Sequence, residues 1–299
     1  MLKNKKQRKP RSIVKGIGKM KFVRLGIPHF HWGDLYHLLL EISWLNFFGL
    51  ISLVYFAINI IFAFAYLLEG DGIENAQAGS FGDAFFFSVQ TMATIGYGAM
   101  YPRTPYTHFL VAIEVLIGLL AVAMATSLMF ARFSRPTARV LFSRIAVICP
   151  YNGVPTLMFR VANQRRNWIV EAQIRLSILL PAQVTPEGHS IRRLSDLKLV
   201  RSENPFLALT WVVMHTIEPG SPLYGETADS LNSWNSEIVV TLTGLDETVA
   251  QTIHTRHTYE IDDILWDVRF ADVLSITPEG DRYIDYSHFH DVVPLDNNI

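Results

Sequence analysis

The chain has 299 residues, with 26 Lys and Arg against 27 Asp and Glu, and its formal net charge of −1 argues against a nucleic-acid partner. Half of its residues are hydrophobic, yet only two apolar runs are long enough to cross a membrane, so a sizeable soluble part is expected. The single cysteine, Cys149, excludes an intrachain disulfide.

The first 28 residues are basic. Ten Lys or Arg lie between Lys3 and Arg24, and no acid precedes Asp34. By the positive-inside rule, residues 1–28 are expected to be a cytoplasmic N-terminus. The first apolar run, beyond this segment, is too long for the apolar region of a signal peptide, so no cleavable signal is predicted.

Residues 29–42 are predicted to form an amphipathic helix at the membrane surface. Asp34, His37 and Glu41 fall on one helical face, while Leu35 and its apolar neighbours fall on the other. The alternative is that this segment simply extends the first membrane helix.

Residues 43–134 are predicted to form the transmembrane pore domain. Its membrane helices are expected at 43–69 and 105–134, because about 20 apolar residues cross the hydrocarbon layer. The apolar run at 83–93 is too short to span, so it is expected to be a re-entrant helix. Backbone that is not helical at this depth must line a pore or be buried in protein.

Residues 94–98 read Thr-Ile-Gly-Tyr-Gly, which is the pattern of a potassium selectivity filter. Such a filter replaces the water around K⁺ with rings of backbone carbonyl oxygens. Gly96 and Gly98 can adopt positive φ, which lets successive carbonyls face one side. The filter residues are therefore Thr94, Ile95, Gly96, Tyr97 and Gly98, with an ordinary glycine-rich turn as the alternative.

The loop between the spans is acidic, whereas arginines follow the second span. Glu69, Asp71, Glu74 and Asp83 oppose Arg103 in the loop, which predicts an outer mouth that attracts cations. The arginines after the second run begin at Arg132, so both termini are expected in the cytoplasm.

Residues 135–150 are predicted to be a linker, and 151–299 a cytoplasmic β-sandwich. From residue 145 onward, 11 Lys and Arg face 20 Asp and Glu, a net charge of −9 that would attract cations or simply keep the surface solvated. Short alternating runs separated by turns favour an antiparallel sandwich, with strands at 156–161, 170–178, 207–214, 237–242, 252–259 and 282–286. No Gly-x-Gly-x-x-Gly motif supports a nucleotide-sensing domain.

The order of these elements resembles the inward-rectifier potassium channels, most closely their prokaryotic members, over roughly residues 30–292. Besides the filter, the resemblance is carried by Phe-Phe-Phe-Ser-Val-Gln-Thr at 85–91, Phe-Ala-Arg-Phe-Ser-Arg-Pro at 130–136, Ile-Val-Glu-Ala at 169–172, Ser-Pro-Leu-Tyr at 221–224, Asp-Ile-Leu-Trp at 263–266 and Asp-Tyr-Ser-His-Phe at 285–289. It implies a homotetramer in a prokaryotic inner membrane, an immunoglobulin-like cytoplasmic assembly, and gating that responds to phosphoinositides.

A tetramer also follows from the chemistry of the filter. One filter loop supplies only one side of the coordination shell of K⁺, so three further identical subunits must complete it. The short helix ends near Ala93, and its negative C-terminal dipole would favour a cation in the central cavity.

The second span is expected to contain the gate. Val122, Thr126 and Phe130 lie four residues apart on one helical face, with Phe130 as the candidate gate and the other two lining the cavity. A lipid-facing position is the alternative for Phe130. Gly118 is a candidate hinge, with a close-packing site as the alternative.

Charged groups suggest further sites. Arg132 and Arg135 are candidate contacts for anionic lipid headgroups, with plain positive-inside anchoring as the alternative. The resemblance makes Glu171 the retained acid of the cytoplasmic pore, while Val122 and Thr243 stand where the stronger eukaryotic rectifiers carry acids. Weak rectification is therefore expected, with Mg²⁺ or polyamines as candidate modulators beside phosphoinositide.

The support of the filter departs from the family pattern. Gln90 replaces a common pore-helix acid, so Glu114, a carboxyl group within the membrane, is the candidate that braces the pore helix instead.

Other classes of function remain open. No catalytic constellation is evident and no enzyme is predicted, although His254 with His257, and His288 with His290, could hold a metal. A two-span potassium channel of another type, and a non-conducting membrane-anchored binding protein, are the further alternatives.

Overall fold

The computed structural model describes residues 13–14, 22–23, 34–181, 183–184, 186, 190–276 and 282–295. It divides into two compact units, one containing residues 27–135 and the other residues 136–299 together with 1–26. Apart from the paired strands β1 (Ile13–Val14) and β2 (Phe22–Val23), the predicted basic N-terminus lies outside the described residues. The same holds for residues 29–33 of the predicted surface helix.

The surface helix is separate from the first membrane helix. Helix α1 (Leu35–Glu41) ends at Ile42, where ψ is 156°, and α2 (Trp44–Leu67) begins after Ser43, where ψ is 157°. The Ser43 hydroxyl accepts the N–H of Asn46 at 3.2 Å and so caps α2. Two consecutive extended residues cannot continue a helix, so α1 is not an extension of α2.

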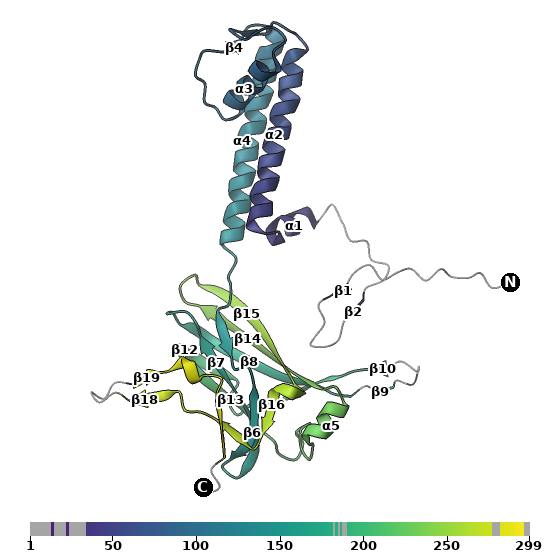
Figure 1. The fold of residues 1–299 in the computed structure, drawn as a ribbon, viewed down its shortest axis with the longest axis vertical. Helices are drawn as coiled ribbons and strands as arrows, with labels where there is room; N and C mark the ends of the chain where they lie inside the picture. Colours follow the sequence, from purple (N-terminus) through teal and green to yellow (C-terminus); the bar gives the residue numbers. More distant parts are fainter. Residues whose placement is uncertain are drawn as a thin grey trace, which may run out of the picture. The chain divides into compact units, whose positions relative to one another are not determined.

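Two helices of the first unit are long and apolar enough to cross a membrane. They are α2 and α4 (Pro105–Phe133), with mean hydropathies of 2.3 and 2.5 over their most apolar windows. Figure 1 shows them side by side, with the shorter α3 (Phe81–Met92) beside one end and α1 at the other. Helix α3 begins two residues before its predicted start because Ser80 caps it by accepting the N–H of Asp83.

A small apolar core joins these helices to the loops around them. Its buried members come from α2, α3 and strand β3 (Ile73–Glu74): Phe62, Ala63, Tyr66, Ile73, Ala84, Phe87 and Met92. Strand β3 pairs antiparallel with β4 (Tyr101–Pro102) in the α3–α4 connection. The loop before α3 and the segment after it are therefore held together.

The second unit is a β-sandwich of two five-stranded sheets. One sheet runs β11–β8–β14–β15 with β12 beside β8, and the other runs β13–β7–β6–β16 with β5 beside β7. The strands of the first sheet are β8 (Ile169–Leu179), β11 (Leu194–Leu197), β12 (Glu203–Leu207), β14 (Glu237–Asp246) and β15 (Gln251–Glu260). Those of the second are β5 (Val140–Phe142), β6 (Ala146–Tyr151), β7 (Val154–Asn163), β13 (Thr210–Thr216) and β16 (Ile264–Trp266).

Alternating side chains fill the space between the sheets. In β8 the residues Ala172, Ile174, Leu176 and Ile178 are all at most 2% exposed, whereas Glu171 and Arg175 are exposed. The predicted fold class, membrane helices followed by an all-β domain, is thereby confirmed. Short helix α5 (Ala228–Ser233) and 3₁₀ turn η2 (Ile261–Asp263) lie at the domain's margin.

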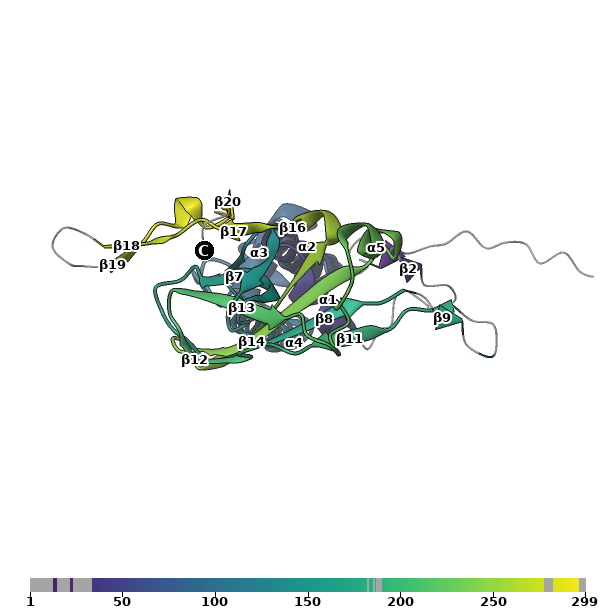
Figure 2. The same ribbon diagram turned by 90° about the horizontal axis from the view of Figure 1, so that it is seen from below.

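The margins also carry short strand pairs. Strands β9 (Gln183–Val184) and β10 (Ser190–Ile191) form one pair, and β18 (Leu274–Ile276) and β19 (Arg282–Ile284) another. Figures 1 and 2 show these pairs projecting from opposite sides of the domain. Strand β17 (Val268–Phe270) pairs with β20 (Val292–Pro294).

Three details of the predicted strands were wrong. The single strand expected at 207–214 is two strands, because the chain leaves β8 in one sheet and joins β7 in the other at residues 208–209. The strand at 282–286 ends at Ile284, and residues Tyr286–His288 form a 3₁₀ turn. The sandwich is not wholly antiparallel, since β16 returns through η2 and pairs parallel with β6.

Candidate functional site

The candidate filter starts where α3 ends. Ala93 is the C-cap of α3, and the chain then turns back on the helix through two backbone hydrogen bonds. Thr94 N–H donates to the Thr91 carbonyl at 3.0 Å, and Ile95 N–H donates to the Gln90 carbonyl at 2.8 Å. The inner end of residues 94–98 is therefore attached to the pore helix by backbone bonds.

The backbone of residues 94–98 alternates in handedness. Thr94, Gly96 and Gly98 have φ of 54°, 60° and 79°, whereas Ile95 and Tyr97 are not among the positive-φ residues. Alternating right- and left-handed residues turn successive N–H groups toward one side of the chain and the carbonyls toward the other. Ile95 is 46% and Tyr97 76% exposed, so this segment is uncovered in a single chain.

A buried polar network lies behind the pore helix. Glu114 of α4 is fully buried, and its carboxyl group accepts hydrogen bonds from Ser88 of α3 and, at 2.6 Å, from Tyr66 of α2. Ser88 also lies 2.9 Å from the side-chain oxygen of Asn59, whose amide donates to the Tyr55 carbonyl at 2.8 Å. These groups join all three helices, as expected for polar side chains within a membrane.

Two residues of this network were missed in the sequence. Asn59 lies 29 residues before Ser88 and Tyr66 lies 48 residues before Glu114, so only the fold brings these partners together. Asn59 is a polar residue inside an otherwise apolar run, and that is the signal that could have identified it. Gln90, named with Glu114 as filter support, contributes its backbone carbonyl to Ile95.

Gly118 of α4 faces the end of the pore helix. A Cβ atom on Gly118 would lie 2.7 Å from the Met92 carbonyl oxygen and 3.1 Å from Met92 Cγ. Helix α4 continues without a break through this position. The geometry therefore favours the close-packing alternative, and the hinge remains a prediction.

The candidate cavity face of α4 is uncovered in the single chain. Val122 is 64% and Phe130 72% exposed, and Thr126 between them is exposed as well. Only 11% of the most apolar window of α4 is buried. Apolar area on this scale must be covered by lipid or by other protein.

Arg132 holds α1 against the end of α4. Its guanidinium donates to the carbonyls of Leu39 and Ile42, both at 2.6 Å, and lies 4.5 Å from the Trp44 ring and 4.6 Å from the Phe47 ring. These carbonyls belong to the C-terminal turn of α1, where the carbonyl groups have no hydrogen-bond partner within the helix. Arg135, in contrast, is exposed and makes one long hydrogen bond of 3.4 Å to Leu40.

Glu171 lies on the outward face of its sheet. It is exposed and has a φ of 50°, which is uncommon for a residue with a side chain. The register of the neighbouring strand β14 shifts between Thr243 and Leu245 at this level. Thr243, the other position considered for a pore acid, lies 3.1 Å from His254 Nδ1.

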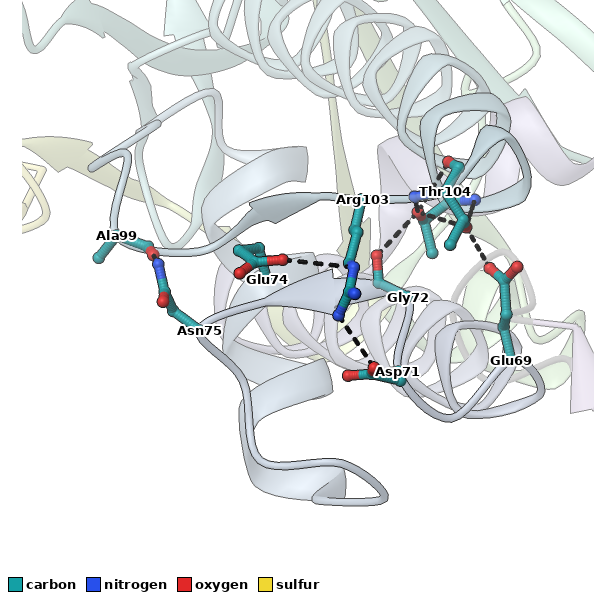
Figure 3. Close-up of polar contacts among 9 residues, drawn as sticks. Glu69, Asp71, Gly72, Glu74, Asn75, Ala99, Arg103 and Thr104 are labelled. Atoms are coloured by element: carbon teal, nitrogen blue, oxygen red, sulfur yellow. Dashed lines mark hydrogen bonds and ion pairs between the residues drawn. The ribbon is translucent and has the colours of Figure 1, made fainter.

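The acids of the α2–α3 loop and of the first turn of α3 form hydrogen bonds and ion pairs within this region and with the segment before α4. Figure 3 shows Arg103 between Asp71, at 3.0 Å, and Glu74, at 3.5 Å. Glu69 accepts a hydrogen bond from the Thr104 hydroxyl, and Asp83 accepts the N–H of Gln77 at 2.8 Å. The predicted acidic mouth is thus also a set of structural contacts.

The candidate metal-binding histidines have other partners. His257 stacks on Phe142, with ring centroids 5.1 Å apart, and burial lowers the pKa of His257. His288 lies 2.7 Å from Asp291, whose hydrogen bond raises the pKa of His288. Within the described part of the chain, no group of three metal-ligating side chains occurs.

Comparison with known proteins finds two family matches. Residues 140–298 match the family described as inward rectifier potassium channel C-terminal domain, and residues 44–135 match the family described as ion channel. The inward rectifier potassium channel Kirbac3.1 of Paramagnetospirillum magnetotacticum is 48% identical over 286 residues, which cover 95% of this chain and 96% of that protein.

Animal channels match as well. The ATP-sensitive inward rectifier potassium channel 12 of Gallus gallus is 32% identical, over 88% of this chain and 66% of its own length. The G protein-activated inward rectifier potassium channel 1 of Bos taurus is 37% identical, over 72% of this chain and 44% of its own length. All three proteins are named as ion channels and none as an enzyme.

Proposed function

The chain belongs to the inward rectifier potassium channel family, and from this premise we propose that four identical copies form a K⁺-selective pore. Each copy contributes one filter segment, residues 94–98, to a shared axis, because one segment can coordinate only one side of an ion. Potassium ions pass through by displacing one another between neighbouring rings of oxygen.

The alternation of handedness along residues 94–98 is the observation that carries this proposal. Positive φ at Thr94, Gly96 and Gly98 aligns the carbonyls of Thr94, Ile95, Gly96 and Tyr97 on one side, and the Thr94 hydroxyl adds the innermost ring. An ordinary glycine-rich turn has no reason to place a threonine in the left-handed region, which disfavours residues with a Cβ.

The helices would supply the rest of the pathway. The C-terminal end of α3, at Ala93, carries a partial negative charge that favours a cation in the central cavity. Val122 and Thr126 would line that cavity, and four copies of Phe130 would close it at the far end of α4 by excluding water. Their exposure in the single chain supports this assignment.

Anionic lipid would act where α1 meets α4. Arg135 is the better candidate for a phosphoinositide headgroup, because the guanidinium of Arg132 already has two carbonyl partners and two rings. Arg132 would then transmit the effect of lipid by holding α1 to α4. Following the basic flanks, we place residues 1–28 and 135–299 in the cytoplasm. Following the similarity to a bacterial channel, we place the pore domain in a prokaryotic inner membrane.

The C-terminal domains would continue the pore. Glu171 lies on an exposed sheet face with a strained backbone, a combination often found at functional positions. Four such carboxylates around the axis would attract cations, including Mg²⁺ and polyamines. Because Val122 is apolar, the cavity holds no matching acid, and intrinsic rectification would be weak.

A flux measurement tests the proposed function. The purified full-length protein is reconstituted in liposomes of defined lipid content, with and without phosphoinositide, and the uptake of K⁺, Rb⁺ and Na⁺ is compared. Uptake of K⁺ and Rb⁺ should greatly exceed that of Na⁺, and Ba²⁺, which has the size of K⁺, should block it. Equal permeability to Na⁺ and K⁺ would overturn the assignment.

A further inference from the structure

We propose that Asn75, in the α2–α3 loop, is a positioning residue for the outer end of the filter. Its side-chain amide donates a hydrogen bond of 2.9 Å to the carbonyl oxygen of Ala99, the residue that directly follows Gly98 (Figure 3). The inference rests on the proposed filter function and assigns a residue outside the filter sequence to the same process.

The two ends of the filter are held in different ways. The inner end is attached to α3 through backbone bonds from Thr94 and Ile95. At the outer end, Asn75 is the one side chain in the described part of the chain that hydrogen-bonds the backbone of residues 94–100. The outer end therefore depends on a contact made from a separate loop.

Asn75 combines two properties that this position needs. Its φ is 64°, in the left-handed region, which asparagine tolerates better than most residues with a side chain. It also carries an N–H₂ group, the donor that a carbonyl oxygen requires. Glycine would satisfy the first requirement alone, and aspartate would satisfy the first while placing an acceptor against the Ala99 oxygen.

The loop that presents Asn75 is itself anchored. Residue Ile73, two positions before it, is buried in the core beside the pore helix, and β3 pairs with β4 only three residues beyond Gly98. Arg103 N–H donates to the Gly72 carbonyl at 2.8 Å, and the Thr107 hydroxyl donates to the same oxygen at 2.9 Å. A rigid base is needed if one amide is to fix a carbonyl.

Side-chain charges reinforce this base. The guanidinium of Arg103 lies between Asp71 and Glu74, and Thr104 donates to Glu69. The Arg103 and Asp71 side chains are 55% and 67% exposed, and exposed ion pairs each contribute little. The backbone hydrogen bonds and the buried Ile73 are therefore the main anchors of the loop. Asn75 connects this anchored loop to the outer end of the filter through its hydrogen bond to Ala99.

The consequence concerns the outermost filter carbonyl. Gly98 separates Tyr97 from Ala99 and lacks a side chain that would restrict its rotation. Without a fixed Ala99 carbonyl, rotation about Gly98 would let the Tyr97 carbonyl leave the axis. Selectivity would then fall although the chain remains folded and assembled.

The experiment compares four forms of the full-length protein in vesicles of phosphatidylethanolamine and phosphatidylglycerol. They are the parent, Asn75→Gly, Asn75→Asp and the matched control Asn152→Gly, which alters another left-handed asparagine (φ 52°) in a turn of the C-terminal domain. The measured quantities are the K⁺/Na⁺ permeability ratio, from reversal potentials, and the assembly state, from size-exclusion chromatography.

We expect Asn75→Gly to lower the permeability ratio about fivefold, the effect of losing one net hydrogen bond, and Asn75→Asp to lower it further. Assembly should match the parent in both, and Asn152→Gly should leave the ratio unchanged. Parent-like ratios in both Asn75 variants would overturn the inference, and so would failure of Asn75→Gly to assemble, because Asn75 would then serve folding alone. An unselective parent would instead refute the proposed function.

Discussion

The hydroxyl group of Tyr66 donates a hydrogen bond of 2.6 Å to Oε2 of Glu114, and both side chains are at most 2% exposed. The two residues are 48 positions apart and belong to different membrane helices. Together with Ser88, this pair connects both long helices to the back of the pore helix. The Glu114 carboxyl group thus lies behind the helix that precedes the candidate filter, and its support of that filter remains a prediction.

Glu114→Ala should destabilise the assembled protein and abolish K⁺ flux. It leaves the buried Tyr66 hydroxyl without its acceptor, which costs about 1–3 kcal/mol per subunit. The Ser88 hydroxyl retains its hydrogen bond to the Asn59 side chain. The check is the melting temperature of the detergent-solubilised protein, together with liposome flux. Glu114→Gln retains an acceptor and should be intermediate between the parent and Glu114→Ala. The double variant Glu114→Ala with Tyr66→Phe, which removes donor and acceptor together, should be milder than Glu114→Ala alone. Equal stability of all four forms would contradict a bracing role.

Gly96→Ala should abolish selective flux while the protein remains in the membrane. The residue has a φ of 60°, and an alanine held there costs about 1–2 kcal/mol in each subunit. No atom of the same chain lies within 4 Å of the added Cβ, so within one subunit the effect would come from the backbone conformation. Gly49→Ala in α2 is the matched control, since it also meets no atom and its φ is helical. Selective K⁺ flux in Gly96→Ala would refute the filter assignment.

Val122→Asp should strengthen voltage-dependent block by spermine applied from the cytoplasmic side. Four carboxylates in the cavity would hold the polyamine within the membrane field, where each charge gains up to about 2.3 kcal/mol per 100 mV. Currents of the parent and the variant, recorded over a range of voltages, give the measurement. Unchanged block would mean that Val122 does not face the conduction path.

Glu171→Gln should weaken whatever block the parent shows. The substitution removes four negative charges from the proposed vestibule and keeps the shape of the side chain. The K⁺/Na⁺ permeability ratio serves as the internal control and should not change, because the filter is untouched. If Glu171→Gln shows block equal to or stronger than that of the parent, Glu171 lies away from the ion pathway.

Acidification should destabilise the C-terminal domain through His215. Burial lowers the pKa of His215 below its ordinary value of 6.5, although the Lys198 carbonyl and Glu218 oppose the shift. In the folded state Nδ1 lies 2.7 Å from the Lys198 carbonyl, which requires a donor there, so Nε2 accepts from Ser221 at 2.8 Å. A group whose folded pKa is lowered stabilises the fold above its unfolded pKa, and that contribution is lost as the pH falls from there toward the folded pKa.

The measurement is the tryptophan-monitored melting temperature of the full-length protein at about pH 7.5 and about pH 5.5, on either side of the ordinary histidine pKa. His215→Gln keeps polar atoms at this position without a titrating group. The amount by which its melting temperature falls below that of the parent should therefore be smaller at the lower pH. A deficit that is constant or grows on acidification would show that His215 does not lose stabilising interactions when it is protonated.

Much of the site could be predicted because its chemistry is local in the chain. The dimensions of the bilayer require contiguous apolar runs, and those runs correspond to α2 and α4 within a few residues. The candidate filter is five consecutive residues, and its glycines coincide with left-handed backbone. Alternation in β8 likewise reflects a property of one strand, the opposite orientation of successive side chains.

Contacts between distant residues could not be predicted in the same way. The tie from Asn75 to Ala99 links segments on either side of α3, and the network around Glu114 draws from three helices. The chain passes between the two sheets at residues 208–209 without a proline or glycine there to mark the change. Each of these depends on which surfaces pack together.

The sequence by itself determined the family, the two membrane helices and the all-β character of the C-terminal half, and it predicted the candidate filter. Each of these follows from the pattern of neighbouring residues that contact water, lipid or an ion. Only the tertiary structure decided that Arg132 holds α1, that Gly118 admits the Met92 carbonyl, and that Glu114 is buried against Tyr66 and Ser88. Those partners are selected by packing and by the need of every buried polar group for a hydrogen bond, which act across the whole fold.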